Sequence, residues 1–250
     1  MGTENYSDLQ LDNLHFKIDS MKSDMAVKKQ ADYGLLVAER KTCRKCHPDL
    51  TNQAAVDGGC HDSSDIGAWS RWQGNLNASL MVVGQDWGGV TYFRSNDGQE
   101  GRSQTNDNLV KLIRGVGISI GAPRSSEGRN AVFFTNAILC LKCGPLQAPV
   151  QTRWFHNCSY FLKRQIEIVR PRVVVALGEK ACRSILSTYG QKAGKFSVEV
   201  GNPNGRELIE GVHFFAMYHC GARVTNTTRT LPQQQNDWLR VRQYLGDAPG

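Results

Sequence analysis

Between residues 80 and 245 the sequence alternates short apolar runs with longer amphipathic segments, and this alternation restricts the fold more than any other feature. The predicted strands lie in Leu80–Val83, Ala131–Leu139, Arg172–Leu177 and Val212–Tyr218. The predicted helices cover Asn106–Val116, Thr152–Val169, Lys180–Thr188 and Pro232–Leu245. Strands that alternate with helices are typical of an α/β fold, in which a parallel sheet is covered by helices on both faces.

The region before the first predicted strand lacks this alternation of strands and helices. Residues 1–25 are polar and without pattern, and we predict a mobile N-terminal tail. From Ala26 to about Arg40 apolar residues recur at helical spacing, which predicts a helix. The stretch Thr51–Asn77 is rich in Gly, Asp, Ser and Asn and is predicted to be a long surface excursion. We therefore expect one domain over residues 26–250.

Composition narrows the class of protein. With 250 residues and 40% apolar content, the chain can bury a full core. No stretch approaches the roughly 20 apolar residues of a membrane span, and the N-terminus lacks the apolar core of a signal peptide, so we expect a cytoplasmic protein. The net charge of +7 is compatible with a merely basic surface or with a polyanionic partner such as nucleic acid.

Polar residues follow the predicted strands where each one ends. Gly84, Gln85 and Asp86 follow the first strand, Asn136 the second, and His219 the last. Each could have an ordinary role, because carboxylates cap helices and asparagines support turns. In parallel sheets, however, the carboxyl ends of the strands meet at one edge, where ligands bind. We therefore expect these side chains to converge.

Together these groups suit cleavage of an N-glycosidic bond. A carboxylate at Asp86 can orient water and stabilise a cationic sugar. The amide of Asn136 offers one acceptor and two donors, which match the edge of a pyrimidine. A donor at His219 can stabilise negative charge on a departing base. Backbone N–H groups of the glycine-rich turn that begins at Gly84 can add further donors.

The chain has eight cysteines, which in a reducing compartment indicate metal or reactive sites rather than disulfides. Cys43 and Cys46 form one C-x2-C pair, and Cys140 and Cys143 form another, with Cys158 some way beyond. Two such pairs are typical of a structural zinc site. The cysteine pattern alone indicates a metal without deciding which.

Three segments, GQDW, TNA and YHCGAR, resemble the active-site segments of the uracil-DNA glycosylase superfamily. The stretch TNAILC…NCSYFLKRQIEIVRPRVVVALG is similar to the iron–sulfur branch, called family four. The resemblance covers roughly Cys43 to the C-terminus. It implies a three-layer α/β/α sandwich with a central, mostly parallel sheet, and an enzyme that binds DNA and flips a damaged base into a pocket.

The resemblance also implies a ligand set for the metal. In family four an early C-x2-C pair and two cysteines flanking a long loop hold a [4Fe–4S] cluster, and these match Cys43, Cys46, Cys140 and Cys158. The alternative set replaces Cys158 with Cys143 and would bind zinc. We favour the cluster, with a structural role in organising the loop between Cys140 and Cys158 beside DNA.

The first segment departs from family four, which has a glutamate followed by Ala-Pro-Gly there. Gln85 and Asp86 are closer to family one, and Asp86 matches its catalytic aspartate. We expect Gly84, Gln85 and Trp87 to contact the base. The tyrosine that excludes thymine in family one has no clear counterpart, and Trp87 or Gly88 falls near its position. The aromatic residue that stacks on the flipped base has no clear match, and Tyr92 and Phe93 are the candidates. The preferred base therefore stays open.

The segment after His219 resembles the loop that enters the duplex as the base leaves. Arg223 occupies the position of the apolar wedge, and Arg223 and Arg229 suit phosphate contacts, although a plain solvated loop is the alternative. We expect a monomeric glycosylase that removes uracil or another deaminated base. Two other hypotheses are a non-catalytic iron–sulfur or zinc protein that binds nucleic acid, and a glycosylase-like protein that captures the abasic sugar through His219.

Overall fold

The computed structural model describes residues 6–67, 72–125, 132–144 and 148–246, with the backbone alone for residues 6–19 and 22. Its centre is a five-stranded sheet in the order β3-β2-β5-β7-β6. The strands are β2 (Leu80–Gly84), β3 (Val132–Asn136), β5 (Val173–Leu177), β6 (Arg206–Ile209) and β7 (Val212–Met217). Neighbouring strands are parallel except for β6, which pairs with β7 in the antiparallel sense at the edge of the sheet.

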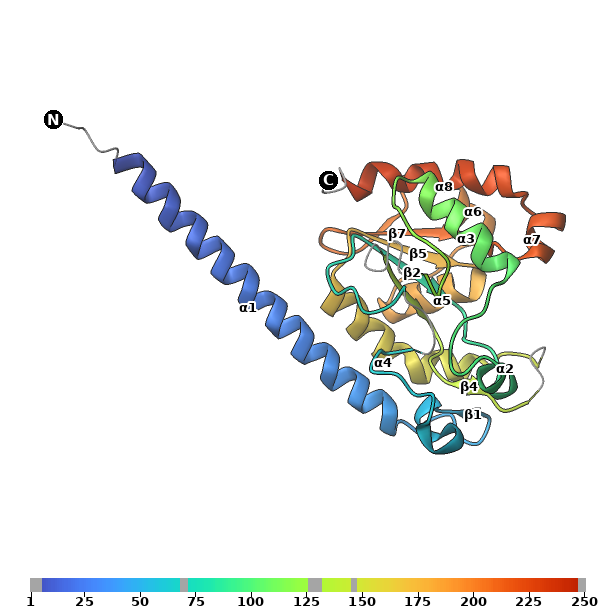
Figure 1. Ribbon diagram of the computed structural model, residues 1–250. Helices are drawn as coiled ribbons and strands as arrows, with labels where there is room; N and C mark the ends of the chain where they lie inside the picture. The colour runs from blue at the N-terminus through green and yellow to red at the C-terminus, as the bar shows by residue number, and fades with distance from the viewer. Residues whose placement is uncertain (1–5, 68–71, 126–131, 145–147, 247–250) are drawn as a thin grey trace.

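Helices cover both faces of this sheet (Figure 1), so the predicted three-layer α/β/α architecture is confirmed. On one face α3 packs against α8, and on the other α4 packs against α5 and α1. The bounds are α1 (Tyr6–Thr42), α3 (Gln104–Gly115), α4 (Thr152–Val169), α5 (Glu179–Thr188) and α8 (Leu231–Leu245). All four predicted strands and all four predicted sheet-covering helices are present, with bounds that differ by a few residues at most.

Side chains alternate between the two faces of the sheet, as the strand period of two requires. In β2, Leu80 and Val82 pack into the core beneath α3 and α8. Met81 and Val83 point the other way, into the core beneath α1, α4 and α5. Because both faces of β2 are covered, all five of its residues are buried. This explains why the strand reads as a continuous apolar run rather than an alternating pattern.

Several smaller elements were not predicted. A separate two-stranded sheet joins β1 (Leu50–Thr51) to β4 (Leu141–Lys142) in antiparallel pairing. The remaining elements are the 3₁₀ segment η1 (Gln53–Gly59) and the short helices α2 (Val90–Ser95), α6 (Phe196–Gly201) and α7 (Ala222–Thr227). The sheet β1-β4 is small, but it brings the first cysteine segment beside the chain that leaves β3.

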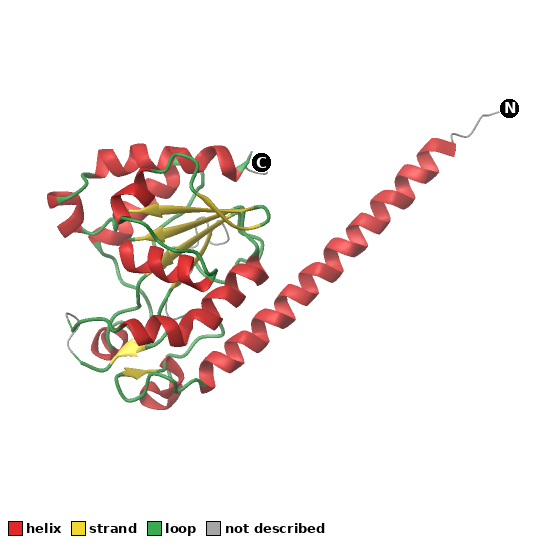
Figure 2. Cartoon of the chain, turned by 180° about the vertical axis from the view of Figure 1, so that it is seen from behind, coloured by secondary structure: helices red, strands yellow, loops and turns green. Residues whose placement is uncertain are grey.

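The first helix is longer than predicted, since α1 begins at Tyr6 rather than near Ala26. Figures 1 and 2 both show its N-terminal half extending away from the rest of the chain, whereas its C-terminal half lies beside α4. Among the described side chains of α1, Lys29 is the first with a hydrogen bond to the rest of the domain, donating to the carbonyls of Leu76 and Val169 at 3.0 and 3.1 Å. Residues 1–5 lie outside the described residues, so the predicted mobility of residues 1–25 stays a prediction.

The excursion predicted over Thr51–Asn77 is only partly on the surface. Ile66 is fully buried and Trp72 is 2% exposed, and the Trp72 indole donates to the Gly121 carbonyl at 3.0 Å. Arg40 anchors this segment through hydrogen bonds to the Asp62 carboxylate and to the Asp65 carbonyl at 2.7 and 2.9 Å. The polar composition suggested a surface loop because the few large apolar residues that enter the core have no periodic spacing.

None of the helices in the described part of the chain combines the length and apolar character needed to cross a bilayer.

Adjacent leucines on α1 test whether its C-terminal half belongs to the domain. Leu36 is 2% exposed in the core under α4, whereas Leu35 is 66% exposed. Leu36→Ala should lower the free energy of unfolding by about 2–5 kcal/mol because it leaves a cavity. Leu35→Ala should change it by no more than about 0.5 kcal/mol. Urea denaturation of both variants measures the difference, and equal stabilities would show that α1 is not docked as described.

Candidate active site

The carboxyl ends of β2, β3, β5 and β7 meet at one edge of the sheet, because these strands are mutually parallel. Asp86 follows β2, and Asn136 ends β3 directly beside Gly84, its register partner. His219 lies just beyond β7, and its imidazole is close enough to Asp86 for the carboxylate charge to raise the pKa of the histidine. The predicted convergence of carboxylate, amide and imidazole on one edge is therefore observed.

The carboxylate of Asp86 is held from three directions. Its Oδ2 accepts a hydrogen bond from Gln85 Nε2 at 2.6 Å and lies 3.3 Å from the ammonium of Lys142. Its Oδ1 accepts from the Gly88 backbone N–H at 2.9 Å. A carboxylate oxygen can accept about two hydrogen bonds. Within the described part of the chain, Oδ1 therefore keeps capacity for one more donor, such as a water molecule.

The absence of a side chain at Gly84 leaves space for the side-chain amide of Asn136. A Cβ atom on residue 84 would lie 2.1 Å from Asn136 Oδ1, so only glycine leaves room for the amide in this position. The side chain of Asn136 is thereby held across the end of β2, and the residue is 4% exposed. Gly84 thus contributes space for the amide, in addition to any backbone contact with a ligand.

His219 has a defined tautomer. The Gly221 N–H donates to His219 Nδ1 at 3.1 Å, so Nδ1 is an acceptor and the neutral ring carries its proton on Nε2. The residue is exposed to solvent, yet the surrounding protein desolvates the ring and lowers its pKa, while the Asp86 charge opposes this effect. The lowered pKa keeps the imidazole neutral, with its Nε2–H available as a donor, to a lower pH than usual.

The loop that carries His219 is fixed from behind by α3. Asn108 donates through its side-chain amide to the Cys220 carbonyl at 2.7 Å. At Gly221 an added Cβ would lie 3.0 Å from both the His219 ring and Thr105 Oγ1. This close packing fixes the loop that follows β7.

Two of the residues predicted to contact the base have other partners. Gln85 uses its amide to hold Asp86. Trp87 is 5% exposed and packs edge-on against Phe134, with ring centroids 5.9 Å apart. Only small residues fit beside this indole, because a Cβ on Gly67 would lie 2.2 Å from it. Trp87 therefore forms part of the wall behind the Asp86 turn.

The structure excludes one of the two candidates for the stacking aromatic. Phe93 is fully buried in a cluster with Val56, Trp87 and Leu141, so its ring cannot face a flipped base in this conformation, and that expectation is corrected. Sequence alone did not reveal this, because α2 turns Phe93 inward. Tyr92 is partly exposed and donates its hydroxyl to Glu100 Oε1 at 2.9 Å.

Two charged residues at or near the site were missed. Lys142 attracted no notice because it lies between two cysteines in LCLKCG, and only the fold brings it to Asp86. Glu100 lies in a polar stretch with no periodic pattern, where nothing distinguishes it. Burial raises the pKa of Glu100, although hydrogen bonds from Tyr92 and Asn106 oppose the effect.

The two predicted DNA-contacting arginines differ. Arg223 is exposed on α7, beyond His219. Arg229 forms a two-pronged ion pair with Asp237 of α8, at 2.9 and 2.7 Å. Arg229 therefore anchors the end of the loop to α8, and Arg223 is the better placed of the two to reach a phosphate.

Glu179, which begins α5 beside the same edge, is paired on its own helix. Arg183 donates to its carboxylate at 2.9 and 2.7 Å, and both side chains are about half exposed. These residues line a hollow of about 760 Å³ between α4 and α5.

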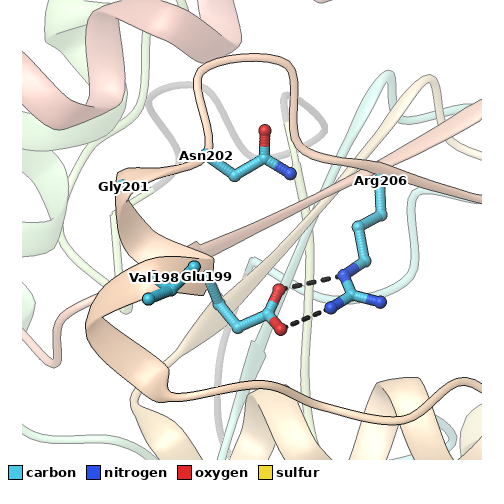
Figure 3. Close-up of a pocket in the computed structure, with 5 residues that line it drawn as sticks. All are labelled: Val198, Glu199, Gly201, Asn202 and Arg206. Atoms are coloured by element: carbon cyan, nitrogen blue, oxygen red, sulfur yellow. Dashed lines mark hydrogen bonds and ion pairs between the residues drawn. The ribbon is translucent and has the colours of Figure 1, made fainter.

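A separate hollow of about 630 Å³ is bounded by α6 and β6 (Figure 3). There, the Arg206 guanidinium donates two hydrogen bonds to the buried carboxylate of Glu199, one of them at 2.9 Å. The Gly194 N–H donates to the same carboxylate at 2.7 Å. Three protein donors therefore hold this carboxylate. This arrangement ties α6 to β6 and has no part in the site at the sheet edge.

The cysteines predicted as metal ligands lie together at the base of α1 and α4. Cys46, Cys140 and Cys158 share one buried apolar cluster with Leu50 and Trp154. Burial raises the pKa of Cys140, and the charges of Cys158, Cys43 and Cys46 raise it further, which places all four sulfurs within electrostatic reach of one another. Burial likewise raises the pKa of Cys158 to about 12.

Cys143 is not part of this group. It is exposed, it lies outside the buried cluster that holds Cys46, Cys140 and Cys158, and its sulfur is 2.7 Å from Thr51 Oγ1. Across residues 6–67, 72–125, 132–144 and 148–246, however, no three Cys, His, Asp or Glu side chains are already grouped closely enough to hold a metal ion. The donor set therefore fits a metal centre in residue type and location, and the sulfurs would have to move inward to bind one.

Comparison with known proteins agrees with this geometry. A type-5 uracil-DNA glycosylase of Pyrobaculum aerophilum is 32% identical over 189 residues, which cover 69% of this chain and 77% of that protein. A type-4 uracil-DNA glycosylase of Saccharolobus solfataricus is 24% identical over 222 residues, covering 86% and 87%. A type-4 uracil-DNA glycosylase of Archaeoglobus fulgidus is 25% identical over 215 residues, covering 84% and 92%.

The family model described as the uracil DNA glycosylase superfamily matches residues 72–245, which contain the whole central sheet and all the polar groups at its carboxyl edge. The match extends over more than half of the chain. The predicted membership of the superfamily is thereby confirmed. This chain belongs to the uracil DNA glycosylase superfamily.

Proposed function

We propose that the protein is a DNA glycosylase that hydrolyses the N-glycosidic bond of uracil, or of a related deaminated base, and leaves an abasic site. The observation that carries the proposal is the convergence of Asp86, Asn136 and His219 on one edge of the sheet. The relatives named as uracil-DNA glycosylases support uracil as the substrate. A non-catalytic nucleic-acid-binding protein would not need these three groups in one place.

Asn136 is the proposed reader of the base. Its amide can donate to a uracil carbonyl oxygen and accept from the adjacent ring N–H, a pattern that cytosine does not offer. Its fixed position across Gly84 supports this role, because a rigid amide discriminates better than a mobile one.

Asp86 is proposed to orient the attacking water and to stabilise the positive charge that develops on the sugar. Its Oδ1, which accepts from Gly88 N–H, has capacity to accept a hydrogen bond from water and orient it toward the anomeric carbon. The negative charge also stabilises the positive charge that develops on the deoxyribose as the bond to the base breaks. One carboxylate would thus serve both tasks, as a positioned base and as an electrostatic partner.

His219 is the proposed donor to the departing base. A neutral imidazole that carries its proton on Nε2 can donate to a base oxygen as negative charge accumulates there. The lowered pKa of His219 favours this neutral form. Charge would therefore be stabilised on both sides of the breaking bond, with the carboxylate at the sugar and the imidazole at the base.

DNA is the proposed macromolecular partner, and Arg223 is the proposed contact beyond the site. It is exposed beside the loop that carries His219, and the net charge of +7 favours a polyanion. We also propose that the enzyme acts as a monomer in the cytoplasm.

Cys43, Cys46, Cys140 and Cys158 are the proposed ligands of a [4Fe–4S] cluster. Cys46, Cys140 and Cys158 share one buried cluster, and the charges of Cys43 and Cys46 act on both Cys140 and Cys158, which supports this set over the one that contains the exposed Cys143. When bound, the cluster would crosslink four points of the chain and so fix the segments around β1 and β4. It would have no part in bond cleavage.

Replacing Asp86 tests the role of the carboxylate. Asp86→Asn keeps the shape of the side chain but removes its charge, so DNA binding should persist while excision slows by about 10²–10⁴-fold. The measurement is single-turnover excision from a uracil-containing duplex, with affinity determined on the same oligonucleotide. Asp24→Asn, at an exposed position of α1, is the matched control. A wild-type rate in Asp86→Asn would remove Asp86 from the mechanism.

Replacing Asn136 tests the reading of the base. Asn136→Asp turns the donor end of the amide into an acceptor, so uracil excision should fall by several orders of magnitude. Asn204→Asp, which adds the same charge in an exposed turn, should retain full activity. Competing uracil and cytosine oligonucleotides provide the assay. Full uracil activity in Asn136→Asp would mean that the residue only supports a turn.

Two serine variants test the ligand set. Cys158→Ser should abolish bound iron and the broad visible absorption of the purified protein, whereas Cys143→Ser should retain both. Elemental analysis and absorption spectroscopy on the two proteins give the result. Stoichiometric zinc, lost on replacement of Cys143, would contradict the cluster.

A further inference from the structure

Lys142 connects β4 to the turn that carries Asp86. Its backbone N–H donates to the Gly88 carbonyl at 2.9 Å, and the residue forms a parallel bridge with Gly89. On its other side it pairs with Leu50 of β1. The main chain of Lys142 is therefore fixed between β1 and the turn after β2.

The side chain of Lys142 reaches the same turn a second time. Its ammonium lies 3.3 Å from Asp86 Oδ2, and the two side chains are only 7% and 8% exposed. An ammonium loses hydration when it is buried, and a nearby carboxylate compensates for that loss. Backbone and side chain of one residue thus hold the Asp86–Gly89 turn at two points.

The two carboxylate oxygens of Asp86 have different hydrogen-bond and ion-pair partners. Oδ2 receives both Gln85 and Lys142, whereas Oδ1 receives the Gly88 N–H alone among the described residues. If the charge of Lys142 were absent, Oδ2 would keep only the flexible amide of its chain neighbour. The carboxylate could then rotate, and Oδ1 would no longer be the oxygen left for a ligand.

We propose that Lys142 is a positioning residue for Asp86, which fixes Oδ2 toward β4 and leaves Oδ1 to hold the attacking water. This role rests on the proposed glycosylase function. Lys142 also connects the cysteine-bearing segments to the site. It follows Cys140 by two residues, and β4 pairs with the strand that follows Cys46. A metal at those cysteines would fix β4, and β4 fixes the carboxylate.

A double-mutant cycle is the test, because a residue that acts through Asp86 has nothing to act on once the carboxylate is gone. Lys142→Met should slow single-turnover uracil excision by about 10- to 100-fold. In the Asp86→Asn background the same change should cost no more than about 2-fold. Lys142→Arg, which keeps the charge, should recover much of the loss. Lys192→Met, at an exposed lysine after α5, is the matched control.

Equal losses in both backgrounds would overturn the proposal, because they would mean that Lys142 acts independently of Asp86. A covalent complex with DNA, trapped by borohydride in wild type and lost in Lys142→Arg, would overturn it as well. In that case the amine would attack the sugar carbon itself, the N-glycosidic bond would break with the base leaving, and opening of the sugar ring would give the imine that borohydride reduces.

Hydrogen exchange across residues 86–89 gives a readout that does not need excision. The Gly88 amide donates to Asp86 Oδ1, so its exchange should accelerate in Lys142→Met and stay closer to that of the wild type in Lys142→Arg. Faster exchange in a protein whose wild type releases no base would contradict the proposed function but support the positioning role. Unchanged exchange, with normal excision in Lys142→Met, would contradict the positioning role alone.

Discussion

The site depends on the parallel pairing of β2 with β3 and β5. Because these strands run in the same direction and in register, Gly84 lies beside Asn136 and the chain that leaves β2 carries Asp86 to the same edge. A slip of one residue would turn the buried side chains to the opposite face and move every polar group away from its neighbour. Two apolar cores, one on each face of the sheet, oppose such a slip. The packing of the two cores therefore determines where the polar groups of the site lie.

The second constraint is the pair of charges formed by Asp86 and Lys142. Almost completely buried charges are stable only with partners, so each fixes the other in place. The pair crosses from the main sheet to the small sheet β1-β4, whose other strand follows the first cysteine segment. The proposed bond cleavage and the proposed metal binding would be chemically separate in this arrangement, but both would depend on the position of β4.

The sequence was sufficient for the main architecture and for the convergent groups. Continuous apolar runs such as Val173–Leu177 predict strands buried on both faces, and parallel strands imply a common edge for Asp86, Asn136 and His219. Lys142 and the buried state of Phe93 were not predictable in this way. Lys142 meets Asp86 only because β4 folds back beside Gly89, and Phe93 points inward only because α2 is short and turns it toward Leu141. Neither contact can be predicted from the spacing of apolar residues in the sequence.

The central claim is that the groups at this edge release a base from DNA. Product analysis by mass spectrometry, on single- and double-stranded oligonucleotides that carry uracil, hypoxanthine or xanthine, tests it most directly. The account predicts free uracil in equal amount to an alkali-labile abasic strand that is otherwise intact. Oligonucleotides bound by the protein but recovered unchanged, with no base released from any of the three, would contradict it.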